Sequence, residues 1–151
     1  PLFVRTPDSK FELANFMRVH LSTALGALKT GMVILTKQEH VELDKMLGHG
    51  GLFKTKGVGQ KILAGAIDTP VYVMETAGEG GAWGIALLAS YMKNKKAEES
   101  LTDDLAAHVF GGEEGARMEP DPADVAGFDA YIKAYKAALA AEKAAVEAMP
   151  L

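Results

Sequence analysis

Four consecutive residues, Gly48, His49, Gly50 and Gly51, form the part of this sequence best suited to hold a ligand. Glycines that follow a strand allow backbone N–H groups to approach a ligand with no Cβ in the way. A helix that begins behind such a turn favours anions and polar ring edges at its N-terminus. Neither a GxxxxGK[ST] loop nor a GxGxxG fingerprint is present, so the pattern leaves two interpretations open. The turn either binds a ligand or only needs a residue with positive φ.

The other residues capable of chemistry form no recognisable constellation. The four histidines stand in no HExxH or comparable spacing, so no metal ligand is predicted; they are His20, His40, His49 and His108. We expect His20 to pack on a helix and His49 to stabilise the turn. The carboxylate pairs lie in polar segments, where a raised pKa suited to general acid–base catalysis is not expected; they are Asp103 and Asp104, Glu113 and Glu114, and Asp121 with Asp124.

Alternating strands and helices should position the glycine turn. Apolar runs and β-branched content predict strands at 2–4, 41–47 and 70–74. Apolar spacings of three and four residues predict helices at 10–36, 57–67, 82–93, 101–110 and 123–148. A turn is expected at 79–81 and a loop at 111–122. This order predicts an α/β fold with a short parallel-type sheet, covering helices and a long C-terminal helix.

Composition narrows the classes of function. The chain has 151 residues and no cysteine, so disulfides, thiolate zinc sites and cysteine nucleophiles are excluded. The net charge of −4 gives no basic stripe, and we therefore expect no nucleic-acid partner. No run approaches the roughly 20 apolar residues of a membrane span, so no membrane partner is expected either. A reducing cytoplasm is the expected location.

Spaced positions around the turn resemble a known family. Gly50-Gly51 is followed in order by Thr55, Gln60, Ala64 and the segment Thr69-Pro70-Val71. This order is similar to the C-terminal domain of the FGGY carbohydrate kinases. Matching positions also occur downstream and upstream; they are Glu75, Glu79, Ala82, Gly84 and Ala86, the stretch from Leu2-Phe3 to Arg18 and His20, and the tail from Glu119 to Tyr135. The tail is like that of the pentulose kinase branch, xylulokinase-like or ribulokinase-like.

The resemblance implies a partial actin-like, ribonuclease H-like ATPase domain. Residues 1–151 would then be the C-terminal portion of a nucleotide-binding domain, with ATP or ADP and Mg²⁺ as cofactors, the metal held through the nucleotide. Carried over to this chain, Gly50 and Gly51 would meet the adenine or ribose, and Thr55 would hydrogen-bond the base or sugar. Gln60 is a further candidate one helical turn later. The sequence departs from the family pattern at His49 and at Phe53-Lys54.

The resemblance also implies that essential parts of a kinase lie outside these residues. The family's catalytic base is an Asp of the N-terminal portion, and its main phosphate-binding segments lie there too, so we expect no catalytic residue here and no activity from the chain alone. The sugar, a pentulose such as D-xylulose, would bind through that N-terminal domain. A homodimer is compatible with the sequence. Phe53-Lys54 supports an alternative hypothesis, a non-catalytic interaction domain that keeps the fold without binding nucleotide.

Overall fold

The computed structural model describes residues 2–110 and 115–149 and divides the chain into two compact units. Unit 1 comprises Pro1–Leu43, Ile62–Asp68 and Pro120–Leu151, and unit 2 comprises Asp44–Lys61 and Thr69–Glu119. The boundary falls inside the helix α3 (Val58–Ile67), which the apolar spacing at 57–67 predicted correctly.

Unit 1 is built from helices. The single helix expected at 10–36 is divided into α1 (Leu13–Ala24), α2 (Gly26–Val33) and the π-helical turn η1 (Ile34–Gln38). The break coincides with a close approach, because a Cβ on Gly26 would lie 2.9 Å from Cζ of Tyr135. The glycine thus admits the tyrosine ring at the point where the chain bends.

The strand expected at 2–4 was wrong. Leu2, Phe3 and Val4 are irregular and about half exposed, and none of them pairs with a described strand. A short apolar run becomes a strand only where an edge accepts its backbone hydrogen bonds.

Among the described residues, no single helix is long and apolar enough to cross a membrane; α1 with α2 and η1 reaches that length and composition only as a pair bent by 45°.

The long C-terminal helix α6 (Pro122–Ala148) agrees with the sequence prediction. It begins after Asp121, whose Oδ1 accepts the backbone N–H of Ala123 at 2.8 Å, and it has proline in its first turn. Phe128 and Ile132 are buried. Polar contacts fasten this helix to α1 and α2; they are Arg18–Asp124 at 2.5 Å, Thr23–Tyr131 at 2.5 Å and Lys29–Asp129 at 2.9 Å.

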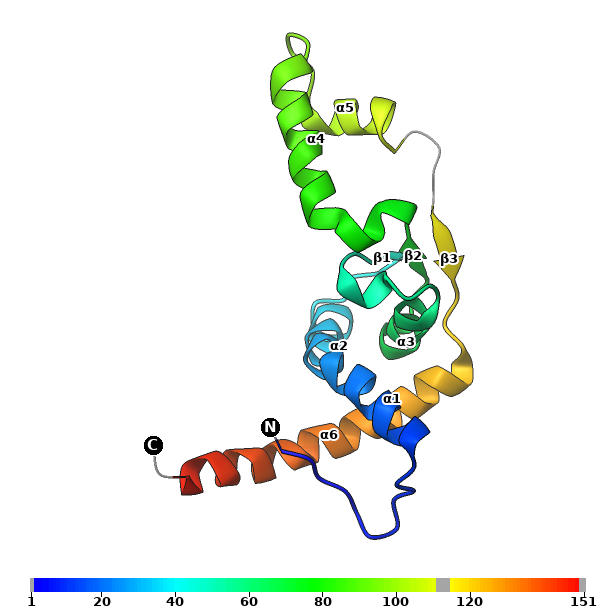
Figure 1. Cartoon of the computed structure of the whole chain (residues 1–151), viewed down its shortest axis with the longest axis vertical. Coiled ribbons are helices and arrows are strands. Elements are labelled where there is room, and N and C mark those ends of the chain that lie inside the picture. Colours follow the sequence, from blue (N-terminus) through cyan, green and yellow to red (C-terminus); the bar gives the residue numbers. More distant parts are fainter. Residues whose placement is uncertain (1, 111–114, 150–151) are drawn as a thin grey trace. The chain divides into compact units, whose positions relative to one another are not determined.

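Unit 2 contains a three-stranded sheet (Figure 1). The strands are β1 (Met46–Leu47), β2 (Val71–Val73) and β3 (Ala116–Met118), in the order β1-β2-β3. β1 pairs with β2 in parallel, as expected for a short parallel-type sheet, whereas β3 pairs with β2 in antiparallel orientation, so the sheet is mixed. β3 also lies inside the expected loop at 111–122, of which residues 111–114 are outside the described part of the chain.

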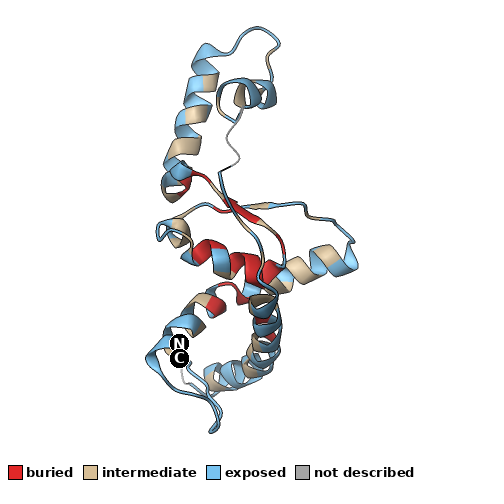
Figure 2. Ribbon diagram, turned by 90° about the vertical axis from the view of Figure 1, so that its right-hand side faces the viewer, coloured by how far each residue is buried: buried red, intermediate tan, exposed pale blue. Residues whose placement is uncertain are grey.

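Buried residues of unit 2 gather on β2 and the segment after it (Figure 2). Val71 is fully buried, and Tyr72, Met74 and Ala77 are also buried. The remaining elements are the 3₁₀ turns η2 (Gly51–Phe53) and η3 (Glu75–Glu79) and the helices α4 (Gly80–Asn94) and α5 (Leu101–His108). The turn expected at 79–81 is therefore the end of η3 and the first residues of α4. The helices predicted at 82–93 and 101–110 are confirmed with shifted ends.

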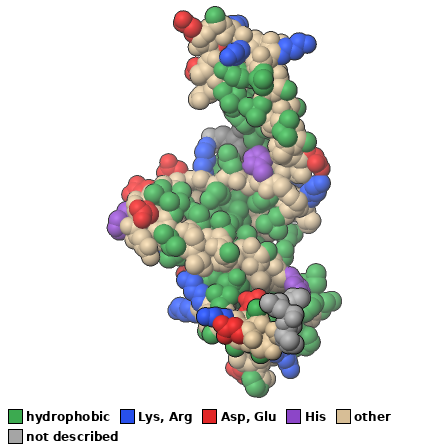
Figure 3. Space-filling view, turned by 90° about the vertical axis from the view of Figure 1, so that its left-hand side faces the viewer, with side chains coloured by type: hydrophobic (Ala, Val, Ile, Leu, Met, Phe, Trp, Pro, Cys, Tyr) green, Lys and Arg blue, Asp and Glu red, His purple; other side chains and the backbone are tan. Residues whose placement is uncertain are grey.

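Helix α4 is apolar but has no buried residue. Ile85, Leu88 and Met92 are spaced for one helical face and are 72%, 48% and 77% exposed. Figure 3 shows hydrophobic side chains along this helix on the face in view. The apolar periodicity thus predicted the helix, although in this structure it does not correspond to burial.

Candidate functional site

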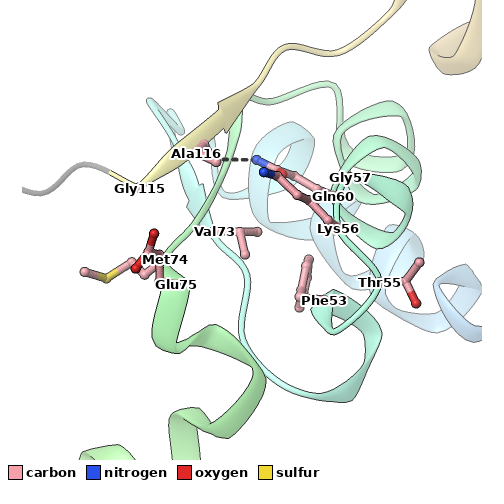
Figure 4. Close-up of a pocket in the computed structure, with 10 residues that line it drawn as sticks. All are labelled: Phe53, Thr55, Lys56, Gly57, Gln60, Val73, Met74, Glu75, Gly115 and Ala116. Carbon is pink, nitrogen blue, oxygen red and sulfur yellow. Dashed lines mark hydrogen bonds between the residues drawn. The ribbon is translucent and has the colours of Figure 1, made fainter.

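A cavity of about 500 Å³ lies in unit 2, beside the start of α3 (Figure 4). Its wall combines the loop after η2, the first turn of α3, the end of β2 and the start of β3. The lining residues are Phe53, Thr55, Lys56, Gly57, Gln60, Val73, Met74, Glu75, Gly115 and Ala116. Segments separated by about sixty positions in the sequence therefore form one pocket within a single unit.

The glycine turn is fixed by the backbone at Gly50. This residue has φ 103° and ψ −173°, a conformation that is essentially restricted to glycine. Its N–H donates to the carbonyl of Ala77 at 2.8 Å, and its carbonyl accepts the N–H of Phe53 at 3.1 Å. The interpretation that the turn needs positive φ is therefore correct for Gly50.

Gly51 differs from Gly50. Its φ is not positive, and a Cβ built on it would meet no atom within 4 Å. Neither backbone conformation nor crowding inside the chain requires glycine here. The backbone of Gly51 is thus open to an approaching molecule, although the residue does not line the cavity itself.

Thr55 and Gln60 both line the cavity, but their polar groups are placed differently. Thr55 is exposed, and in Figure 4 its side chain projects from the loop away from Met74 and Glu75. Gln60 is only 5% exposed, and its Nε2 donates to the carbonyls of Val71 at 2.7 Å and Ala116 at 2.6 Å. Gln60 therefore joins α3 to β2 and β3, and both of its donor hydrogens serve the fold.

The two residues that depart from the family pattern occupy separate places. Phe53 lines the cavity and also packs on Gly48, where a Cβ would lie 2.5 Å from its ring. Lys54 does not line the cavity and instead pairs with Glu79 at 2.6 Å. The hydrogen bond from Lys54 and its charge lower the pKa of the exposed Glu79 carboxyl. The cavity thus gains an aromatic face and does not receive the Lys54 charge.

The electrostatic character of the cavity comes from three sources. Gly57, with φ 78°, directs the chain into α3, whose first turn contains no acidic residue. The N-terminus of a helix carries partial positive charge, and Lys56 adds a full charge beside it. Glu75 contributes one carboxylate on the opposite wall. The arrangement suits a flat, polar molecule with anionic groups.

Only part of this wall was expected from the sequence. Thr55 and Gln60 were expected as site residues, whereas Phe53 was expected only as a departure from the family pattern. Gly115 and Ala116 were missed because they lie in the segment that was expected to be a loop. His49 packs against Gly80, where a Cβ would be 2.8 Å from its Nδ1, and it lines no part of the cavity.

Residues 1–92 match the sequence model of the FGGY family of carbohydrate kinases, C-terminal domain. The match covers more than half of the chain and includes the glycine turn and every lining residue up to Glu75. It does not extend to α5, β3 or α6. No curated protein and no solved structure matches the chain.

Proposed function

The chain belongs to the FGGY family of carbohydrate kinases, and from this premise we propose that its cavity beside α3 binds the adenosine end of ATP. In this proposal the chain is the nucleotide-binding portion of an enzyme that transfers the γ-phosphate of ATP to a sugar hydroxyl. The single observation that carries it is a cavity with an aromatic wall and a helix N-terminus, whose aromatic residue, Phe53, belongs to the same turn η2 as the open Gly51.

The chemistry of the cavity fits an adenosine group. Its volume of about 500 Å³ is within the range of roughly 300–1,000 Å³ that is usual for small-molecule pockets. Phe53 offers a ring on which a purine can stack, since aromatic faces pair favourably in offset geometry. We propose that the Gly51 backbone contacts the base or ribose and that the Thr55 hydroxyl hydrogen-bonds the same group.

The anionic end of the nucleotide is favoured by the start of α3. Backbone N–H groups at a helix N-terminus attract phosphate, and Lys56 lies at the same place. We assign no residue of this chain to Mg²⁺, which would reach the enzyme with the nucleotide. Phosphoryl transfer depends on positioning and on electrostatic stabilisation of the transferred group. The proposed contribution of this chain is to position ATP, whereas the base that deprotonates the sugar belongs to the N-terminal portion of the enzyme.

We further propose a pentulose such as D-xylulose as the sugar. The support is the resemblance of the tail from Glu119 to Tyr135 to the pentulose kinase branch. Apart from Glu119, which follows β3, that segment lies in unit 1. In this proposal the sugar contacts belong to the N-terminal domain of the enzyme. A comparison of D-xylulose, L-ribulose and glycerol as acceptors for the full-length enzyme tests this assignment; preference for glycerol would contradict it.

A second candidate, an interaction domain without nucleotide binding, is favoured by two observations. The donor hydrogens of Gln60 are committed to the sheet, and Thr55 projects from the outer side of its loop. In that case the cavity would be a consequence of the fold, and substitutions around it would change stability without changing nucleotide affinity.

Calorimetric titration of the full-length protein with ADP distinguishes the candidates. We expect Gly51→Val and Thr55→Ala to weaken binding, by about tenfold or more for the valine, because its side chain occupies the approach to the backbone. Gly81→Val is the matched control, since Gly81 also has no atom within 4 Å of a built Cβ and lies outside the cavity. Unchanged affinity in both test variants, or absence of ADP binding by the parent, would reject the proposal.

A further inference from the structure

A second cluster of ligating side chains lies in unit 2, outside the cavity. Glu99, Asp104 and His108 each offer one donor atom, and these atoms all lie within 4.8 Å of one another. Within 2–110 and 115–149, no other group of three His, Asp or Glu side chains meets this criterion. The cluster lies beyond residues 1–92, so the family match does not cover it.

We propose that Glu99, Asp104 and His108 form a binding site for Zn²⁺ or a related divalent first-row transition metal. Imidazole nitrogen with carboxylate oxygen is a usual donor set for such ions, whereas Mg²⁺ and Ca²⁺ select oxygen ligands. Two carboxylates and one neutral imidazole together carry a charge of −2, which a divalent cation neutralises. Three protein ligands leave further coordination positions for water.

The local structure already brings two of the ligands together. Asp104 and His108 are four residues apart on α5, so their side chains share a face of the helix. Oδ1 of Asp104 lies 3.0 Å from Nδ1 of His108. With metal–ligand bonds of about 2.0–2.2 Å, neighbouring ligands of a tetrahedral ion are separated by about 3.3–3.5 Å. The pair therefore needs to open by only a few tenths of an ångström.

Glu99 completes the set from the connection that precedes α5. Its Oε2 accepts the backbone N–H of Lys96 at 3.0 Å, and its carbonyl accepts the hydroxyl of Tyr91 at 2.7 Å. Glu99 is thus held both at its backbone and at its carboxylate. Outer contacts of this kind orient a ligand before the metal arrives. Glu99 and Asp104 are half-buried, and His108 is exposed, so the site has buried support and an open side for entry.

A bound ion would hold α5 against the connection that precedes it. The helix has only eight residues, and helices of this length are marginal without tertiary support. Since the ligands converge only when the helix is folded, metal binding would stabilise the folded form by mass action.

Calorimetric titration of the full chain with ZnCl₂, in the absence of nucleotide, tests the site. We expect one equivalent of Zn²⁺ to bind. Glu99→Gln and His108→Ala should each reduce the affinity at least about tenfold, because even the loss of a residue that only hydrogen-bonds to a metal ligand reduces metal affinity by about 10- to 100-fold. Alanine is the best helix former, so His108→Ala does not break α5. Glu98→Gln removes the same charge from the adjacent residue and should leave the affinity within about twofold of the parent.

A second measurement separates this site from binding at the other histidines. Co²⁺ added to isotope-labelled protein should broaden the imidazole signals of His108 before those of His20, His40 or His49. Absence of zinc binding, equal loss in Glu98→Gln, or retained affinity in His108→Ala would overturn the proposal.

Discussion

Gln60 should contribute strongly to the stability of unit 2. It is 5% exposed, and its amide donates to Val71 at 2.7 Å and to Ala116 at 2.6 Å. Gln60→Leu would remove both bonds and leave two carbonyls without this donor. A lost bond to a buried partner costs about 1–3 kcal/mol, and one that water can replace costs about 0.5–1.5 kcal/mol. The apolar burial of leucine offsets part of this loss, so we expect a net decrease of about 2–3 kcal/mol in the free energy of unfolding.

Urea unfolding followed by the fluorescence of Trp83 measures this change in the relevant unit. Trp83 is the sole tryptophan, lies in unit 2 and packs edge-on against Phe110 with ring centroids 5.8 Å apart. The melting temperature should fall by about 5–10 °C, at about 2–4 °C per kcal/mol for a chain of this size. Hydrogen exchange should become faster at the β3 amides, because Gln60 fastens that strand to α3.

Gln38→Leu is the matched control for this prediction. Gln38 is exposed at the end of η1, in unit 1, and its replacement should change stability by less than about 0.5 kcal/mol. A Gln60→Leu variant that unfolds within 0.5 kcal/mol of the parent would refute the structural role. So would loss of ADP affinity at unchanged stability, which would make Gln60 a ligand contact instead.

The turn, the exposed ion pair and the last helix can each be tested by substitution. Gly50→Ala should cost about 1–3 kcal/mol in urea unfolding because alanine is strained at φ 103°, whereas Gly51→Ala should be nearly neutral; equal effects would contradict this. The hydrogen bond from Lys54 lowers the pKa of Glu79, so its NMR titration midpoint should rise in Lys54→Met. A carboxyl whose pKa is lowered in the folded state stabilises the fold at pH values above its unfolded-state pKa, and this stabilisation is lost as the pH falls through the folded-state pKa. An unchanged titration midpoint in Lys54→Met would refute the pairing. Asp121→Ala should cost about 1 kcal/mol by removing the cap of α6, measured by thermal unfolding; no loss would mean that the cap is dispensable.

The sequence predicted elements whose signals are local. The helices α3 and α6 follow from apolar spacing, and the strand β2 follows from β-branched content. The segment at 2–4 has the same kind of apolar run as β2 but does not become a strand. What separates them is an available strand edge, which depends on the whole fold.

β3 could not be predicted because it forms at an available strand edge without a local strand signal. Its three residues, Ala116 to Met118, have little strand propensity, and their order comes from pairing with β2 more than forty residues earlier. Gly115 precedes the strand with φ 73°, and a Cβ there would lie 2.9 Å from the carbonyl of Val73. The close approach of two backbones, rather than a pattern in the sequence, therefore creates that wall of the cavity.

The residues of the candidate site were also predictable only where their signals are local. The glycine turn and Thr55 are local signals, and the resemblance to the family placed them in order. The sequence could not show that Gln60 has a structural role, because a glutamine that joins strands and a glutamine that binds a ligand are the same residue type. Phe53 was visible only as a departure, and its place in the cavity wall became clear from the geometry.

Amide chemical shifts can show directly whether ADP binds in the cavity beside α3. Titration of isotope-labelled protein with ADP should shift the amides of Gly51, Thr55 and Gly57 together, with saturation at one equivalent per site. The unit 1 helices, such as α1 and α6, should serve as an unshifted reference. Saturable shifts around the cavity that are lost in Gly51→Val and kept in Gly81→Val are the predicted result. Saturable ADP shifts that fall elsewhere in the chain, or no shifts at millimolar ADP, would contradict nucleotide binding at the cavity beside α3.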